Sequence, residues 1–170
     1  MGGGLAAGLL AGNRVGAGAG PVEIAMRGNA DGSRVGFDPV GLHLDPGRTV
    51  RWVNLDAGNA HTATAYHPAI MDRPQRVPET AEPWDSDYLF PGEDFSLMLT
   101  VPGVYDYYCV PHEHAGMVGR IVVGEPQATW SGYPDAPADG AALPEVALSG
   151  LPSVADILEH GVVPGRRQGL

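Results

Sequence analysis

The chain has 170 residues, 44% of them hydrophobic and only 18% charged, so a chain that is disordered throughout is excluded. Its ten basic side chains are all arginine and stand against twenty Asp and Glu, which gives a formal net charge of −10 and argues against nucleic-acid binding. The single cysteine, Cys109, excludes an intramolecular disulfide and leaves three roles open for its thiol: a core residue, a nucleophile or a metal ligand.

Residues 1–20 are rich in glycine and alanine and contain one short apolar stretch, Leu5 to Ala11. This stretch is too short to span a bilayer, which takes about 20 apolar residues, but it is typical of the apolar part of a secretory signal. No basic residue precedes Leu5, so two interpretations stand: a signal-peptide remnant whose basic part lies upstream of the given start, or a disordered leader. We expect an exported protein, periplasmic or otherwise extracytoplasmic, with residues 1–20 outside the fold.

Between residues 21 and 125, apolar and polar residues alternate with a period of two, which predicts short β-strands. The predicted strands are 22–26, 40–44, 49–54, 61–66, 95–101, 104–109 and 118–123. Several short strands separated by turn signals are typical of an antiparallel sandwich, so we assign 21–125 to one all-β domain. We expect Trp52 and Trp84 to pack in its core, and His43 to face outward from a strand.

Two regions lack this alternation. Residues 67–94 carry five prolines and no periodic run, which predicts a long loop. Residues 126–170 are a C-terminal extension with a short helix predicted near 153–160, because Ser153 and Asp156 have the spacing of a helix-capping pair and Gly161 is able to end the helix. A helix of two turns is marginal alone, so we expect it to dock on the sandwich or on a partner.

Four candidate metal ligands lie within nine residues of one another: Cys109, His112, His114 and Met117. A fifth candidate, His61, follows a turn rich in glycine and asparagine. Thiolate and thioether ligands select copper, and a His₂Cys set with a weak axial Met is the arrangement of a blue-copper electron-transfer site. The pattern therefore indicates a copper centre with one ligand at the end of a strand, two on the loop that follows, and a fourth from a separate strand.

The segment 105–119 resembles the copper loop of plastocyanin-like cupredoxins, whose pattern is Tyr-x-x-Tyr-Cys-x-Pro-His followed by Ala-Gly-Met-x-Gly. The residues in that register are Tyr105, Tyr108, Cys109, Pro111, His112, Ala115, Gly116, Met117 and Gly119. The segment 37–54, followed by His61, resembles the first half of the family, and the acidic composition is most similar to the halocyanin-like branch. The resemblance covers residues 22–124.

This resemblance implies a cupredoxin-like Greek-key β-sandwich and assigns His61, Cys109, His112 and Met117 as the ligands of one type 1 copper ion per chain. Two positions depart from the family, Thr62 and His114. Thr62 stands where plastocyanins carry an Asn that ties the two ligand loops together. Its hydroxyl is able to donate a hydrogen bond to the loop near Cys109 instead.

His114 competes with His112 as a ligand. Azurin-like loops place the His five residues after Cys, which fits His114, but they place Met four residues after that His, where Val118 stands. The plastocyanin register fits both His112 and Met117, so we predict that His112 binds copper and that His114 is a solvated loop residue. His67 is expected to be a loop imidazole; its alternative role is a ligand, either of a second metal or in place of Met117.

The resemblance implies a one-electron carrier, not an enzyme, whose copper cycles between Cu(II) and Cu(I) while it exchanges electrons with a donor and an acceptor protein. Electrons are expected to pass through His112, the solvent-facing ligand, and Tyr108 resembles the family's second, lateral exit. The chain is expected to be a monomer, with membrane-associated complexes among its candidate partners. The alternatives are an enzyme with one reactive copper, which needs an open coordination position that Met117 argues against, and a copper-delivery or metal-free structural sandwich.

Overall fold

The computed structural model describes residues 14–15, 20–29, 31, 33–125 and 143–165. The predicted leader lies outside these residues except for positions 14, 15 and 20. Two residues of that leader contact the domain: Arg14 pairs with Asp45 and Glu125, and Val15 bridges to Leu44.

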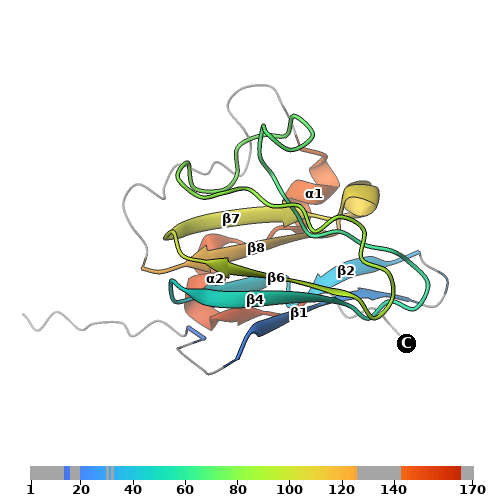
Figure 1. Ribbon diagram of the computed structural model, residues 1–170, viewed down its shortest axis with the longest axis horizontal. Coiled ribbons are helices and arrows are strands. Elements are labelled where there is room, and N and C mark those ends of the chain that lie inside the picture. The colour runs from blue at the N-terminus through green and yellow to red at the C-terminus, as the bar shows by residue number, and fades with distance from the viewer. Residues whose placement is uncertain (1–13, 16–19, 30, 32, 126–142, 166–170) are drawn as a thin grey trace, which may run out of the picture.

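Two mixed β-sheets face each other, and they appear as two layers in Figure 1. The first sheet has the order β2-β1-β4-β6, with β1 Val22–Gly28, β2 Val35–Asp38, β4 Arg48–Asn54 and β6 Asp94–Leu99. The second has the order β5-β7-β8-β3-β9, with β3 Gly41–Leu44, β5 Thr64–Ala65, β7 Gly103–Tyr108, β8 Val118–Val123 and β9 Val162–Val163. The all-β sandwich predicted from the sequence is confirmed.

Two strand pairs run parallel, so the prediction of a wholly antiparallel sandwich was wrong. Strand β1 pairs with β4 in parallel, with Ile24 opposite Trp52, and β3 pairs with β8 in parallel, with Leu42 opposite Ile121. The reason is the crossing of the chain between sheets: β3 lies in the second sheet, and the chain returns to the first sheet in the direction of β1. Alternation of apolar residues predicts where strands are but not which strands pair.

The core between the sheets is built around aromatic side chains. Trp52 lies 5.8 Å from Trp84 and 5.4 Å from Tyr107, measured between ring centroids, and all three side chains are buried. Both tryptophans therefore pack in the core as predicted. Trp84, Val77 and Leu89 come from the proline-rich loop between β5 and β6, so this long loop is anchored by its apolar side chains.

The C-terminal extension folds onto the outer face of the second sheet. The predicted helix is confirmed as α2, Val154–His160, and the Asp156 backbone N–H donates to Ser153 Oγ at 3.0 Å. A second short helix, α1 Glu145–Gly150, and strand β9 were not predicted. Ile157 of α2 is fully buried, and a Cβ at Gly41 would lie 2.9 Å from it, so glycine in β3 permits this close approach. None of the helices in the described part of the chain is long and apolar enough to cross a membrane.

His43 lies on the outward face of its strand, as predicted, but it is buried, with 1% of its surface exposed. Its Nε2 lies 2.9 Å from the Gly124 carbonyl oxygen, and its backbone N–H donates to Gly161 O at 2.7 Å. Alternation does place His43 on the face opposite Leu42 and Leu44, but the extension covers that face, which the strand pattern alone does not reveal.

A buried ionic cluster ties the extension to the sheet. Asp106 of β7 is fully buried and accepts from Arg76 Nε at 2.8 Å and from Arg120 Nε at 2.7 Å. Arg120 Nη1 also donates to Pro152 O at 2.9 Å. One carboxylate thus joins the long loop, two strands and the extension, and its two cationic partners offset the cost of burying its charge.

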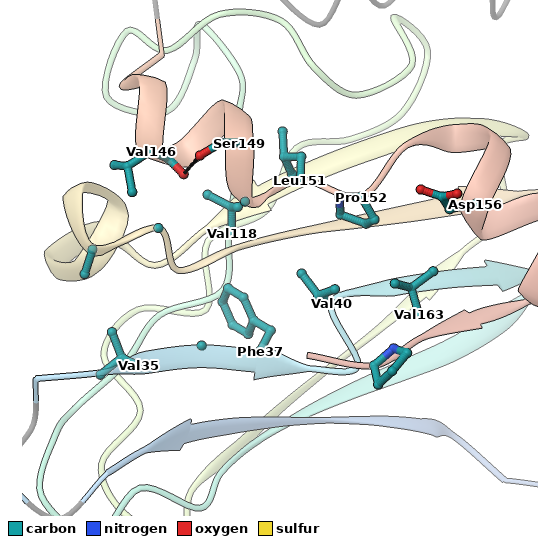
Figure 2. A pocket seen from close by; sticks show the side chains of 15 residues that line it. Val35, Phe37, Val40, Val118, Val146, Ser149, Leu151, Pro152, Asp156 and Val163 are labelled. Carbon is teal, nitrogen blue, oxygen red and sulfur yellow. Dashed lines mark hydrogen bonds between the residues drawn. The ribbon is translucent and has the colours of Figure 1, made fainter. Parts of the chain in front are cut away.

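The extension leaves a cavity of about 280 Å³ between β2 and the two helices, shown in Figure 2. Phe37, Val118 and Leu151 line it, together with the polar side chains of Ser149 and Asp156. Its lining contains none of the predicted metal ligands, although Ala115 and Gly116 of the ligand loop and Val118 of β8 contribute to it.

Candidate metal centre

Three of the four predicted ligands meet at one end of the sandwich. His61 lies in the loop before β5, Cys109 directly follows β7, and His112 lies in the short 3₁₀ helix η1, Val110–Ala115. Nδ1 of His61 lies 3.1 Å from Nδ1 of His112, and Cys109 Sγ lies 3.6 Å and 3.4 Å from these two nitrogens. The three atoms converge so that one ion can contact all of them.

The backbone of the ligand loop closes on itself. The Cys109 N–H donates to Met117 O at 3.0 Å, and the Met117 N–H donates to His112 O at 3.1 Å. Gly116 has a left-handed φ of 78°, which lets the chain reverse between η1 and β8. Met117, the fourth predicted ligand, is fully buried at the point where the loop rejoins the sheet.

Thr62 links the two ligand-bearing loops. Its backbone N–H donates to Cys109 Sγ at 3.3 Å, and its Oγ1 accepts from the Val110 N–H at 2.9 Å. The predicted contact between the Thr62 hydroxyl and the loop near Cys109 is therefore present. The hydroxyl accepts this hydrogen bond, whereas donation was expected from the sequence. Thr64 Oγ1, at 2.8 Å, is its further hydrogen-bond partner.

The second ring nitrogen of His61 is bound by a residue that sequence reasoning missed. Nε2 lies 2.9 Å from Asp56 Oδ2, and the carboxylate is almost fully buried. Burial would raise the pKa of Asp56, but hydrogen bonds from Asn59, Gly58 and His61 outweigh it, and the pKa lies below its usual value. The sequence does show an acidic residue five positions before His61. It does not identify Asp56 as a partner of this ring, because aspartate is common in loops for other reasons.

The metal-free site favours neutral ligands. Burial lowers the pKa of His61, and burial together with its neighbour His61 lowers the pKa of His112. Burial raises the pKa of the Cys109 thiol to about 11, although the Thr62 N–H acts in the opposite direction. Both imidazoles therefore offer lone pairs at neutral pH, and a metal ion that binds Cys109 has to displace its proton.

Glu113 forms a second network that sequence reasoning missed. It is buried although it lies between two histidines, and it accepts from Tyr66 Oη at 2.8 Å and from the Arg73 guanidinium. Tyr66 stacks on Tyr108 with ring centroids 4.3 Å apart, and Arg73 lies 5.2 Å from the Tyr108 ring. Through Glu113, these contacts connect η1 to Tyr66 and to Arg73 of the long loop.

Tyr108, the residue that resembles the family's lateral exit for electrons, is covered in this chain. Its side chain is 3% exposed and packs in a cluster with Tyr66, Leu143 and Ala147, the last of these in α1. The extension and the long loop supply this cover, which a pattern confined to 105–119 could not indicate.

The two competing histidines lie outside the cluster. His114 is exposed and is not among the residues that converge with His61 and Cys109. His67 is a loop residue whose Nδ1 accepts from the Ala69 N–H at 3.0 Å, and it too lies apart from the three converging ligands. The donor set that does converge, two imidazoles and one thiolate, is the set that suits copper.

Comparison with known proteins agrees with this chemistry. Residues 24–124 match the family model described as copper binding proteins, plastocyanin/azurin family. The chain belongs to this family. This cupredoxin is 41% identical over 102 residues to the chloroplastic plastocyanin of Chlamydomonas reinhardtii, covering 59% of this chain and 67% of the relative. It is 38% identical over 95 residues to the chloroplastic plastocyanin of Hordeum vulgare, covering 55% of this chain and 58% of that relative.

A solved structure extends the likeness beyond the matched domain. A pseudoazurin from Sinorhizobium is 29% identical, with a TM-score of 0.53, and the alignment covers 80% of this chain and 92% of that one. The chain spans between about three fifths and two thirds of the length of the two plastocyanins named above. Family, fold and converging ligands together make this chain a cupredoxin of the type 1 copper class.

Proposed function

We propose that this cupredoxin carries single electrons between a donor and an acceptor protein, with one type 1 copper ion held by His61, Cys109, His112 and Met117. The observation that carries the proposal is the convergence of two imidazole nitrogens on one buried thiol, 3.4 and 3.6 Å from its sulfur. When bound, copper supplies a one-electron couple, and His₂Cys with a weak thioether is a donor set acceptable to both oxidation states.

The ligands differ in how much of each side chain is exposed to solvent. Cys109 and His61 are fully buried and exclude water from the centre, whereas His112 is half-buried beside the exposed Pro111 and Ala115. His112 is thus the ligand closest to solvent among the three that converge, and a partner docked on η1 would exchange electrons through its ring. The buried Met117 completes the set from the loop that follows.

The same burial supports a carrier over the two alternatives. An enzyme with one reactive copper needs a position open to substrate, and a fourth ligand at Met117 closes it. A delivery protein has to release its ion, whereas the thiol of Cys109 and the ring of His61 are inaccessible. Titration of the copper-loaded protein with a competing chelator separates these cases: a carrier retains copper, and a delivery protein yields it readily.

The ligand assignment is tested by two paired variants. His112→Ala should open the centre, so that added imidazole restores the visible absorption that the substitution removes. His114→Ala, the matched control two residues away, should leave the spectrum almost unchanged because its ring is exposed. Exchange of these two results would show that the azurin-like register is the right one.

Met117 is tested by its effect on the reduction potential. Met117→Gln introduces a harder oxygen donor and should lower the potential, whereas Met117→Leu removes the donor and should raise it. Voltammetry of both variants measures the shifts. Potentials equal to that of the unaltered protein in both variants would refute the axial assignment, and His67 would be examined next.

We place this carrier outside the cytoplasm, most simply in a periplasmic space, on the basis of the leader pattern in residues 1–20. Its partners are redox proteins, and the net charge of −10 favours a partner with a basic docking face. Fractionation of cells that express the full chain tests the location: recovery in the cytoplasmic fraction alone would contradict it.

A further inference from the structure

We propose that Asp56 is a positioning residue for the copper centre: its buried carboxylate accepts the Nε2–H of His61 and makes this imidazole a donor that favours Cu(II) over Cu(I). The inference rests on the ligand set proposed above. It identifies a determinant of the reduction potential that lies outside the copper-loop motif.

The two nitrogens of His61 face different partners. Nε2 lies 2.9 Å from Asp56 Oδ2, while Nδ1 faces Cys109 Sγ and His112 Nδ1. A carboxylate accepts hydrogen bonds only, so the ring proton belongs on Nε2 and the lone pair belongs on Nδ1. The carboxylate therefore selects the tautomer that presents a lone pair to the metal.

The carboxylate itself is held in place before any metal arrives. Oδ2 accepts from Asn59 Nδ2 at 2.8 Å and Oδ1 accepts from the Gly58 N–H at 2.8 Å. The Asp56 N–H donates to Asn54 Oδ1 at 2.9 Å, which fixes the loop to the end of β4. A Cβ at Gly28 would overlap Oδ2, so glycine at the end of β1 leaves the space that the carboxylate occupies.

In the described part of the chain, no arginine forms an ion pair with Asp56. Among the ion pairs of the described residues, its only basic partner is His61. Its two carboxylate oxygens accept only from N–H donors, those of Gly58, Asn59 and His61, and such donors suit the ionised form. A buried anion hydrogen-bonded to a ligand stabilises the more highly charged metal state, because it strengthens the ligand's donation and attracts the cation.

Asp56→Asn removes this charge while keeping the side chain's size. Loss of a hydrogen-bonding partner behind a metal-bound His commonly costs about 10- to 100-fold in metal affinity. We expect Cu(II) affinity to fall about tenfold relative to Cu(I), and for a one-electron couple this is a rise in reduction potential of about 59 mV. Voltammetry measures the shift, and nitrogen-15 NMR of the Cu(I) form should show the His61 Nε2 proton protected in the unaltered protein and exchanging faster in the variant.

Glu79→Gln is the matched control for charge. Glu79 is exposed and follows Pro78, which packs on Gly103 at the end of β7 opposite Cys109. The Glu79→Gln substitution removes the same formal charge as Asp56→Asn but far from the ligands. The reduction potential of this variant should therefore stay close to that of the unaltered protein. A rise in this control as large as that in Asp56→Asn would assign the effect to net charge and overturn the inference.

Gly28→Ala keeps the net charge and tests position instead, and it decides the question if Asp56→Asn fails to fold. Because the added Cβ requires the carboxylate to move, we expect a rise in potential in the same direction and a weaker His61 Nε2–H signal. If Asp56→Asn and Gly28→Ala are both blue and both keep the reduction potential and the NMR signal of the unaltered protein, the role of Asp56 is overturned and the ligand set stands. An unaltered protein that binds Cu(II) without the intense thiolate band overturns the ligand set itself.

Discussion

Raising the pH of the metal-free protein should destabilise it through one buried thiol. Burial raises the pKa of Cys109 to about 11 from an ordinary value of 9.0. The protonated thiol is therefore favoured in the folded chain, and this contribution is fully present below pH about 9 and is lost as the pH rises toward about 11. Two pKa units correspond to roughly 3 kcal/mol of the free energy of unfolding.

Urea unfolding of the metal-free protein and of Cys109→Ala, at pH about 8 and about 11, measures this loss. Tyrosines titrate in both proteins, so the difference between their pH dependences isolates the thiol. The unaltered protein should lose roughly 2 kcal/mol more than the variant over this range, because at pH about 11 only half of the folded molecules have ionised the thiol. Equal losses would show that the thiol ionises as easily in the folded chain as in the unfolded one, and would refute an uncharged, water-excluded site.

Three further substitutions, the first with a control variant, test contacts within the ligand loops and the surrounding fold. Asp106→Ala removes the buried anion that Arg76 and Arg120 share and should lower the free energy of unfolding by about 3–5 kcal/mol. Its control, Asp94→Ala at an exposed ion pair, should lower it far less; urea unfolding compares the two variants, and equal losses would contradict the burial argument. Thr62→Val leaves the Val110 N–H without its acceptor and should cost about 1–3 kcal/mol and shift the visible spectrum of the Cu(II) form; an unchanged spectrum would mean that the link does not shape the centre. Ser153→Ala removes the cap of α2 and should cost about 1 kcal/mol with no change in the spectrum.

The sequence predicts the local parts of the site well because they are encoded locally. Cys109, His112 and Met117 lie within nine residues, and a loop of that length between two paired strands has few ways to arrange them. The alternation of apolar residues predicts the strands for the same reason, and the spacing of Ser153 and Asp156 predicts α2.

What could not be predicted depends on contacts between distant segments. Asp56 lies only five residues before His61, but the space for its carboxylate is left by Gly28, which belongs to a distant strand. His43 is buried by residues that follow the domain, and Tyr108 is buried by such residues together with Tyr66 and the long loop. A strand pattern alone does not predict this cover. Such contacts are set by packing in three dimensions, and no period or motif in the chain records them.

The central claim, that Cys109 binds copper as a thiolate, is tested most directly by the visible spectrum of the purified protein with Cu(II). A thiolate–Cu(II) bond gives an intense charge-transfer absorption, so the unaltered protein should be deep blue or green. Cys109→Ser should remain folded, as judged by circular dichroism, and should lack this absorption. A colourless Cu(II) complex of the unaltered protein, or an intensely coloured Cys109→Ser variant, would contradict the account.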